Sequence, residues 1–220
     1  MSHPSLRHAV IRTAQHTLAT GLTHGTSGNV SARTPGGFYV TPTGVPYDAL
    51  QPSDIAELDM DGTVMSGDRR PSSEWRIHRD VYASRADAGA VVHVHPPFAT
   101  TIACLRRDLP AVHYMIAAAG GPTVRCAAYA TFGTAELSRA VLEALEGRTA
   151  CLMANHGLVA LGADLDAACT VATEIEKVAE IYWRTLAAGE PAILSHDEMA
   201  QVLERFTDYG QPRSTIPSNS

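Results

Sequence analysis

The sequence predicts an α/β fold, a sandwich in which helices pack on a largely antiparallel sheet. Strand-like and helical segments mix without the regular strand–helix–strand alternation that is typical of a parallel sheet. Asp61-Gly62 separates two short strand-like segments, which is a hairpin signal. With 220 residues, 45% of them hydrophobic, the chain can bury one substantial core. We therefore expect a single domain over residues 1–210, followed by a flexible tail at 211–220.

The elements of the first half follow from periodicity and turn residues. A helix is expected over residues 4–19, because apolar side chains from Leu6 to Leu18 recur at helical spacing and Gly21 follows as a stop. Residues 26–31 are polar and are expected to form a loop. Strands are then expected at 38–41, 55–58 and 63–65, followed by a helix at 73–84 and a strand at 91–95.

The second half alternates in the same irregular way. A helix is expected at 97–107, a short strand at 124–127 and a helix at 135–146. Two strands are expected around His156, one ending at Met153 and one over 158–161. The longest helix is expected at 164–188, ending before Gly189, and a last helix at 197–206.

Composition excludes several functional classes. There are 17 basic and 23 acidic side chains, a formal charge of −6, and no basic stripe, so we expect no nucleic-acid partner. No secretory signal or long uncharged apolar run is present, which indicates a cytoplasmic protein without membrane contact. The four cysteines lie far apart without a Cys-x-x-Cys pair, so they are expected to be reduced core thiols.

Three histidines form a candidate metal site. His93 and His95 are two residues apart near the end of an expected strand, so both imidazoles should point to one face. His156 follows another apolar run. Three imidazoles with an open fourth position are typical of catalytic zinc. The competing interpretation is a chance His-x-His pair, because the chain has ten histidines and spacing alone does not bring the segments together.

Three short polar segments could bind a phosphate. They lie at residues 26–31, 41–44 and 71–74, and each offers hydroxyls and backbone N–H groups. Each also has an ordinary interpretation as turn chemistry or as a helix N-cap. Glu74 is placed where a helix dipole favours a carboxylate. Beside a bound metal it would also be a candidate general base, because a Lewis acid assists removal of a proton next to a carbonyl.

These segments together resemble the class II aldolase/adducin family, and within it the bacterial L-fuculose-1-phosphate aldolases. The resemblance covers nearly the whole chain. Its widely shared motifs are Gly25-Thr26-Ser27-Gly28-Asn29-Val30-Ser31, Thr41-Pro42-Thr43-Gly44, Pro71-Ser72-Ser73-Glu74, Val92-His93-Val94-His95 and Asn155-His156-Gly157-Leu158. The motifs more particular to the fuculose-phosphate branch are His113-Tyr114-Met115-Ile116 and Tyr129-Ala130-Thr131-Phe132-Gly133-Thr134.

The resemblance implies a three-layer α/β/α sandwich and a set of residue roles. One Zn²⁺ per subunit would be held by His93, His95 and His156, with Glu74 joining when substrate is absent. Glu74 and Tyr114 would be the catalytic residues, transferring protons at the carbon and at the new alkoxide. The substrate, a small sugar phosphate, would contact Thr26, Gly28, Asn29, Thr43, Gly44, Ser72, Ser73, Phe132 and Tyr209. The resemblance also implies a homotetramer with active sites between subunits.

The implied activity is reversible, zinc-dependent cleavage of L-fuculose 1-phosphate, or a similar deoxyketose 1-phosphate, to dihydroxyacetone phosphate and L-lactaldehyde. Two departures from the family pattern stand out: Asn155 replaces a histidine beside the expected ligand His156, and the tail after Tyr209 differs. The alternatives are a pentulose-phosphate 4-epimerase or a rhamnulose-phosphate aldolase of the same family, or a non-catalytic adducin-like module. The complete histidine set and Glu74 rank the module last.

Overall fold

The computed structural model describes residues 3–206. Within them, eight strands form one sheet in the order β4-β3-β2-β1-β5-β8-β7-β6. Neighbouring strands pair antiparallel, except that β6 and β7 pair parallel. The predicted α/β class is confirmed, with a sheet that is mixed and mostly antiparallel. The strands are β1 (Asn29–Thr34), β2 (Gly37–Val40), β3 (Ala56–Asp59), β4 (Val64–Ser66), β5 (Ala90–Val94), β6 (Cys126–Ala127), β7 (Ala150–Met153) and β8 (Gly157–Gly162).

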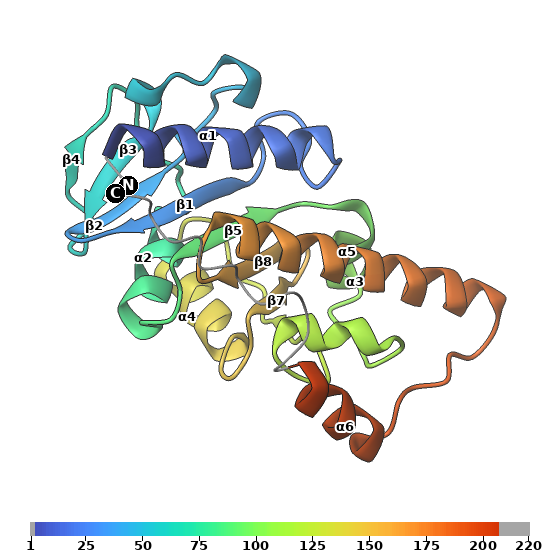
Figure 1. The fold of residues 1–220 in the computed structure, drawn as a ribbon. Helices are drawn as coiled ribbons and strands as arrows, with labels where there is room; N and C mark the ends of the chain where they lie inside the picture. The colour runs from blue at the N-terminus through green and yellow to red at the C-terminus, as the bar shows by residue number, and fades with distance from the viewer. Residues whose placement is uncertain (1–2, 207–220) are drawn as a thin grey trace, which may run out of the picture.

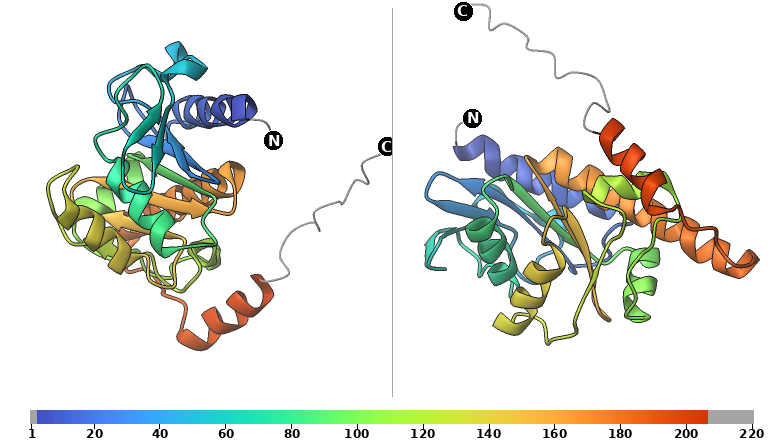
Figure 2. Two further views of the ribbon diagram at one scale, coloured as in Figure 1. Left: turned by 90° about the vertical axis from the view of Figure 1, so that its left-hand side faces the viewer. Right: turned by 90° about the horizontal axis from the view of Figure 1, so that it is seen from below.

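Helices cover both faces of this sheet (Figures 1 and 2). The first, third and fifth helices contribute to the core on one face, whereas the second and fourth pack on the other. The α-helices are α1 (His3–Ala19), α2 (Trp75–Ser84), α3 (Pro97–Cys104), α4 (Ala135–Ala144), α5 (Leu165–Ala188) and α6 (His196–Phe206). Three short 3₁₀ helices are η1 (Tyr47–Ala49), η2 (Pro52–Asp54) and η3 (Tyr114–Ala119).

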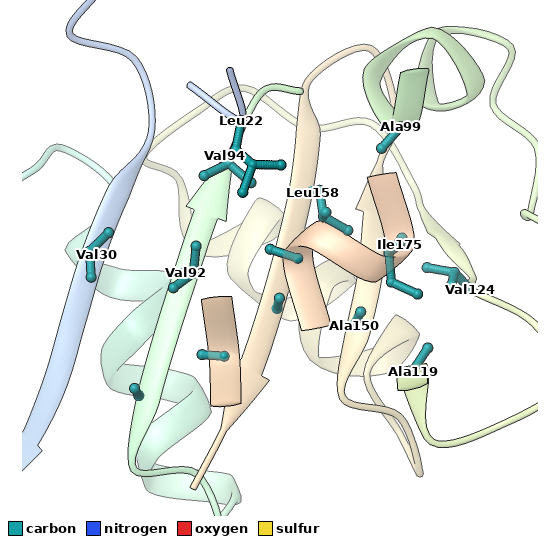
Figure 3. Close-up of a cluster of buried hydrophobic side chains, with 14 of the residues drawn as sticks. Leu22, Val30, Val92, Val94, Ala99, Ala119, Val124, Ala150, Leu158 and Ile175 are labelled. Carbon is teal, nitrogen blue, oxygen red and sulfur yellow. The ribbon is translucent and has the colours of Figure 1, made fainter. Parts of the chain in front are cut away.

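Side-chain alternation along the central strands divides the core in two. Figure 3 shows one half, which includes Val92 and Val94 of β5, Leu158 of β8 and Ile175 of α5. Their neighbour Val91 belongs to the opposite half, beneath α2 and α4. Full burial of such a side chain stabilises the fold by roughly 1.5–3 kcal/mol. The same alternation places His93 on the α2 face of the sheet, where it is completely buried.

The structure corrects three expected boundaries. Residues 29–34 form β1, although the loop was expected to extend to residue 31, because polar Asn29 and Ser31 find buried partners on this strand. Helix α2 begins at Trp75 rather than at residue 73, since Glu74 is a non-helical N-cap with φ −101° and ψ 13°. Helix α3 ends at Cys104 because Arg106 adopts a positive φ of 53°.

The structure also bears on the predictions for membrane contact, for the cysteines and for the C-terminal tail. No helix among residues 3–206 is long and apolar enough to cross a membrane. All four cysteines are free, but Cys104 is exposed, so the expectation of four core thiols is wrong there. Its position at the end of α3, before the chain turns out of the helix, explains the exposure. Tyr209 and the expected tail at 211–220 lie outside the described residues.

Candidate metal centre

The three predicted histidines converge where β5 and β8 lie side by side. His93 is in β5, His95 follows its last residue, and His156 precedes β8. The antiparallel register pairs Val94 with Leu158, and this brings the two histidine-bearing ends together. The turn is tight: a Cβ at Gly157 would lie 2.5 Å from the Val94 carbonyl oxygen. Glycine is therefore the residue that permits this approach.

The geometry of the three imidazoles fits one cation. Their ring centroids are 4.8, 4.9 and 5.0 Å apart, and one ligand atom from each lies within 4.8 Å of the others. His93 Nε2 and His95 Nε2 are 3.0 Å apart. Nitrogens that share a tetrahedral zinc at ~2.0–2.1 Å lie roughly 3.3 Å apart. Among residues 3–206, no other group of three histidine, cysteine or acidic side chains lies close enough to share an ion.

Glu74 completes this cluster from the start of α2. Its Oε2 lies 3.2 Å from His93 Nε2, and its Oε1 lies 3.3 Å from His156 Nε2. The side chain is buried, and Oε1 has no hydrogen-bond donor among the described residues. A buried carboxylate oxygen without a donor is costly, whereas a cation placed between it and the imidazoles would satisfy it. The donor set of three nitrogens and one carboxylate therefore fits zinc.

The protonation of the cluster also favours a cation. Burial alone would raise the pKa of Glu74, but His93, together with His156 and Asn29, holds that pKa well below its usual range. Burial, aided by the other imidazoles, lowers the pKa of His95 to about 3 and that of His156 to about 4. At neutral pH the carboxylate is therefore ionised, and these two rings keep a free lone pair for a metal.

His93 differs from the other two histidines. Burial lowers its pKa, but Glu74 and a hydrogen bond to the Leu158 carbonyl outweigh burial and leave the pKa raised. The Nδ1 atom lies 2.9 Å from that carbonyl oxygen, so Nδ1–H donates and Nε2 faces the cluster. Such a backbone contact fixes the ring orientation of a metal-binding histidine.

A chain of buried polar groups lies behind Glu74. Asn29 Nδ2 donates to Glu74 Oε2 at 3.1 Å, and Asn29 Oδ1 lies 2.5 Å from His78 Nε2. His78 Nδ1 is 2.6 Å from Ser31 Oγ, which in turn is 2.7 Å from the Tyr82 hydroxyl. The sequence assigned His78 no functional role, so this connection was missed. The only available signal was that His78 and Tyr82 share one helix face.

A pocket of about 340 Å³ opens onto His95, His156 and Glu74, whereas His93 is fully buried and does not line it. Of the expected phosphate-binding residues, Thr26, Gly28 and Ser73 line it. Gly28 is conformationally required there, because its φ is +81° and a Cβ would lie 2.6 Å from the His93 carbonyl oxygen. The larger cavity in the structure, about 720 Å³ between α1 and the start of α5, contains no comparable cluster.

The other expected phosphate ligands, Asn29, Thr43, Gly44 and Ser72, do not line this pocket. Thr43 and Gly44 are exposed in a loop, and Thr43 N–H donates to the Arg70 carbonyl at 3.2 Å. That contact holds the loop against the segment that leads to Ser72. Ser72 itself is buried, and its Oγ accepts a hydrogen bond from Glu74 N–H at 3.2 Å.

Aromatic residues form the outer rim of the pocket. Phe132 and Tyr129 both line it. The exposed fractions are 64% for Phe132 and 57% for Tyr129. Tyr114 is 45% exposed at the start of η3 and is not among the residues that line the pocket within this chain.

Asn155, which precedes His156, and His113, which precedes Tyr114, both shape the local backbone. Asn155 adopts a positive φ of 54°, which asparagine tolerates better than most residues, in the turn before His156. Its Oδ1 accepts a hydrogen bond from Arg106 Nε at 2.7 Å, and no described contact joins it to the His156 ring. His113 Nδ1 accepts a hydrogen bond from Met115 N–H and caps η3.

The chain is similar to known aldolases over almost its full length. The family described as Class II Aldolase and Adducin N-terminal domain matches residues 8–183. A 5-methylthioribulose-1-phosphate/5-deoxyribulose-1-phosphate aldolase from Rhodospirillum rubrum is 52% identical, covering 99% of this chain and 97% of its own length. The L-fuculose phosphate aldolase of Escherichia coli K12 is 47% identical, and the match covers 96% of this chain and 98% of that protein. A solved L-fuculose 1-phosphate aldolase structure matches with a TM-score of 0.90 at 41% identity, and the match covers 92% of this chain and 96% of that one.

Proposed function

The chain belongs to the class II aldolase and adducin family, and we propose that it is a zinc-dependent aldolase that cleaves a ketose 1-phosphate reversibly. The products are dihydroxyacetone phosphate and an aldehyde. The observation that carries the proposal is the cluster of three imidazoles, two of which place Nε2 within 3.3 Å of the buried Glu74 carboxylate beside a pocket. One Zn²⁺ per subunit is held by His93, His95 and His156, with Glu74 as a further ligand in the absence of substrate.

Bound zinc supplies a Lewis acid that polarises the ketose carbonyl. The chain's own contribution begins with the phosphate, which hydroxyls and backbone N–H groups of the adjoining loops bind. These groups belong to Thr26, Gly28, Asn29, Thr43, Gly44, Ser72 and Ser73. Because the phosphate is fixed, the carbon next to the carbonyl is held beside Glu74.

Glu74 transfers the proton at carbon. Cleavage of a β-hydroxyketone breaks the bond between C3 and C4, and the carbon that remains with the phosphate must then take up a proton. In the aldol direction the Glu74 carboxylate removes this proton from C3. In cleavage the carboxyl donates it to C3, after taking up through solvent the proton that Tyr114 releases on becoming the base at C4. The depressed pKa keeps the free carboxyl ionised, which is the form that a base requires.

Tyr114 serves the oxygen of the aldehyde half. In the aldol direction its hydroxyl protonates the new C4 alkoxide, and in cleavage it receives that proton. We propose that Tyr114 acts on the site of a neighbouring subunit in a homotetramer, because it is exposed and does not line the pocket of its own chain. Tyr209 is assigned to the same side of the substrate.

Subunit sharing has a direct test. Glu74→Gln and Tyr114→Phe variants should each lose most cleavage activity as pure proteins. Unfolded together and refolded as mixed oligomers, they should regain activity, since some sites then combine an intact Glu74 with an intact Tyr114. If mixed oligomers form and remain as inactive as the parents, each site draws both residues from one chain.

The pocket rim favours an aldehyde with an apolar end. Tyr129, Ala130 and Phe132 line this side, and they offer more apolar surface than hydrogen-bonding groups. L-Fuculose 1-phosphate, 5-deoxyribulose 1-phosphate and 5-methylthioribulose 1-phosphate all end in a methyl or methylthio group. They share the dihydroxyacetone phosphate half, so the same residues would process each. The 52% identical relative favours the two ribulose derivatives alongside the fuculose substrate of the sequence prediction.

A cleavage panel tests the proposal. The three ketose 1-phosphates, L-rhamnulose 1-phosphate and ribulose 5-phosphate are incubated with enzyme, with and without chelator, and dihydroxyacetone phosphate is measured. We expect chelator-sensitive release from at least one deoxy substrate. Conversion of ribulose 5-phosphate to its 4-epimer without triose release would instead indicate an epimerase. Absence of both reactions, together with absence of bound metal, would indicate an adducin-like module.

The proposal includes the wider setting predicted from the sequence. We expect one domain over residues 1–210 with a three-layer α/β/α arrangement, located in the cytoplasm and acting in sugar metabolism. No nucleic-acid or membrane partner is expected. Fractionation and size measurement in solution test the location and the tetramer.

A further inference from the structure

Behind the metal centre, a continuous line of hydrogen-bonding side chains joins Glu74 to the interior of the protein. Asn29 and Ser31 are two residues apart on β1 and share one face, whereas His78 and Tyr82 are one helical turn apart on α2. All four side chains are at most 2% exposed. Buried polar groups on this scale specify one arrangement only when every donor has an acceptor.

The contact between Asn29 and the Glu74 carboxyl group sets the direction of the first two hydrogen bonds in the line. A carboxylate only accepts, so Asn29 must direct its NH₂ group toward Glu74 and its oxygen toward His78. His78 must then donate from Nε2. Burial, aided by the His93 ring, lowers the pKa of His78 to about 3, so its ring is neutral.

The rest of the line follows from the same reasoning. A neutral ring that donates from Nε2 must accept at Nδ1, so Ser31 donates its hydroxyl proton to His78. The Ser31 oxygen then accepts from the Tyr82 hydroxyl. Only one tautomer of His78 and one rotamer of the Asn29 amide satisfy all of these contacts.

We propose that His78 is a positioning residue for the proposed aldolase centre: its Nε2–H locks the Asn29 amide so that Glu74 is held facing the three histidines. If His78 did not donate, the Asn29 amide could turn its oxygen toward the carboxylate, and two acceptors would face each other. Groups behind the metal ligands commonly affect metal affinity or activity by ~10–100-fold. The inference rests on the proposed function for its effect on catalysis, whereas its effect on metal binding is independent of the reaction.

Two substitutions separate this role from a merely structural one. The amide of His78→Gln can reach the position of imidazole Nε2 and donate to Asn29. The amide of His78→Asn reaches only the position of Nδ1, so it can contact Ser31 but leaves Asn29 without its donor. Tyr82→Phe is a matched control, because it removes the far end of the line while the His78–Asn29 contact remains.

The first measurement is zinc affinity, determined by competition with a chromophoric chelator in the absence of substrate. We expect His78→Asn to weaken zinc binding by ~10–100-fold, and His78→Gln and Tyr82→Phe to stay within about threefold of the wild type. Where the wild type has cleavage activity, kcat of His78→Asn should fall while His78→Gln retains most of it. Equal zinc affinity in all proteins, or equal losses in His78→Asn and His78→Gln, would overturn the proposal.

The second measurement determines the tautomer of His78 and does not require the His78→Asn protein. Long-range ¹H–¹⁵N spectra of the metal-free protein at pH 7 should show one neutral imidazole protonated at Nε2 that is absent from His78→Gln. A His78 ring protonated at Nδ1, or at both nitrogens, would refute the assigned direction even if His78→Asn fails to fold. If the wild type releases no triose phosphate, the proposed function fails, but zinc affinity and tautomer still decide the role of His78.

Discussion

The floor and the rim of the pocket are built in opposite ways. On the floor, Glu74 lines the pocket from a helix start and contacts His93, which lies in a central strand beneath it. Both residues are at most 6% exposed and contact fixed partners. At the rim, Phe132 and Tyr129 lie in a connecting segment with more than half of their surface exposed. The chemistry of the floor thus depends on rigid elements of one chain. The rim residues have few fixed contacts, so they can be substituted without disturbing the residues of the floor.

This difference implies a division of labour. Under the proposed function, proton exchange at C3 of dihydroxyacetone phosphate needs only the phosphate loops, the metal and Glu74, whereas cleavage of the whole ketose phosphate needs the rim as well. Exchange in D₂O, followed by NMR, therefore reports on the floor alone, and its comparison with cleavage separates the two regions.

The largest effect is expected when the floor loses a metal ligand. His156→Ala removes one of three imidazoles, so zinc should be lost and both exchange and cleavage should fall by at least about 10⁴-fold, because Lewis-acid assistance amounts to several kcal/mol. Metal content by mass spectrometry and both assays check this. Full activity with bound zinc would show that His156 is not a ligand.

Glu74→Gln should abolish the proton transfer while the imidazoles remain. We expect exchange and cleavage to fall together by ~10²–10⁴-fold. Zinc content should be retained at saturating metal, which distinguishes this variant from His156→Ala. Near-normal exchange would remove Glu74 from the role of base.

Phe132→Ala should separate the two regions most clearly. Loss of apolar contact to the aldehyde end should reduce kcat/KM for 5-deoxyribulose 1-phosphate by roughly 10–200-fold, as for other small apolar recognition elements. Exchange on dihydroxyacetone phosphate should remain within about twofold. An equal loss in both assays would contradict the proposed independence of rim and floor.

The last expected effect is on the stability of the folded protein against acid and not on its activity. Because the pKa of folded His78 lies near 3 and the unfolded value is 6.5, the unfolded chain binds more protons between these values. The contribution of His78 to the free energy of unfolding is therefore constant above pH 6.5. As the pH falls from 6.5 toward 3, the free energy of unfolding declines by at most about 1.4 kcal/mol per pH unit for this proton. In the metal-free protein, His78→Gln should reduce the slope of unfolding free energy against pH by about this amount.

Urea unfolding at several pH values between about 4 and 7 measures this slope. His95 and His156 contribute in the same direction in both proteins, since burial also lowers their pKa values. The difference between wild type and variant therefore isolates His78. Parallel slopes would show that His78 titrates normally in the folded state.

The sequence predicted the metal-binding residues better than the buried polar residues that hold Glu74 in place. Alternation along an apolar run was sufficient to place His93 and His95 together, and the glycine after His156 allowed the tight turn that brings it near. Most helices were also expected within a few residues, because their periodicity is strong. Glu74 was identified by position, although the helix begins only after it.

The hydrogen-bonding residues behind Glu74 were missed because their partners are distant in the sequence. Strand β1 carries buried Asn29 and Ser31, which interrupt the apolar pattern and so resemble a loop; their partners lie more than 40 residues away on α2. His78 is ordinary in its own helix and acquires a partner only through packing. Tyr129 was passed over for a similar reason, since its place at the rim depends on how the segment before α4 folds over the pocket.

The central claim is that one chain gathers three imidazoles around a single divalent cation. Zinc-edge X-ray absorption on the purified protein, combined with metal counting, tests it most directly. We predict one zinc per subunit with three imidazole nitrogens at ~2.0–2.1 Å and an oxygen ligand. Stoichiometric zinc with sulfur ligands, or no tightly bound metal in a folded protein supplied with zinc, would contradict it.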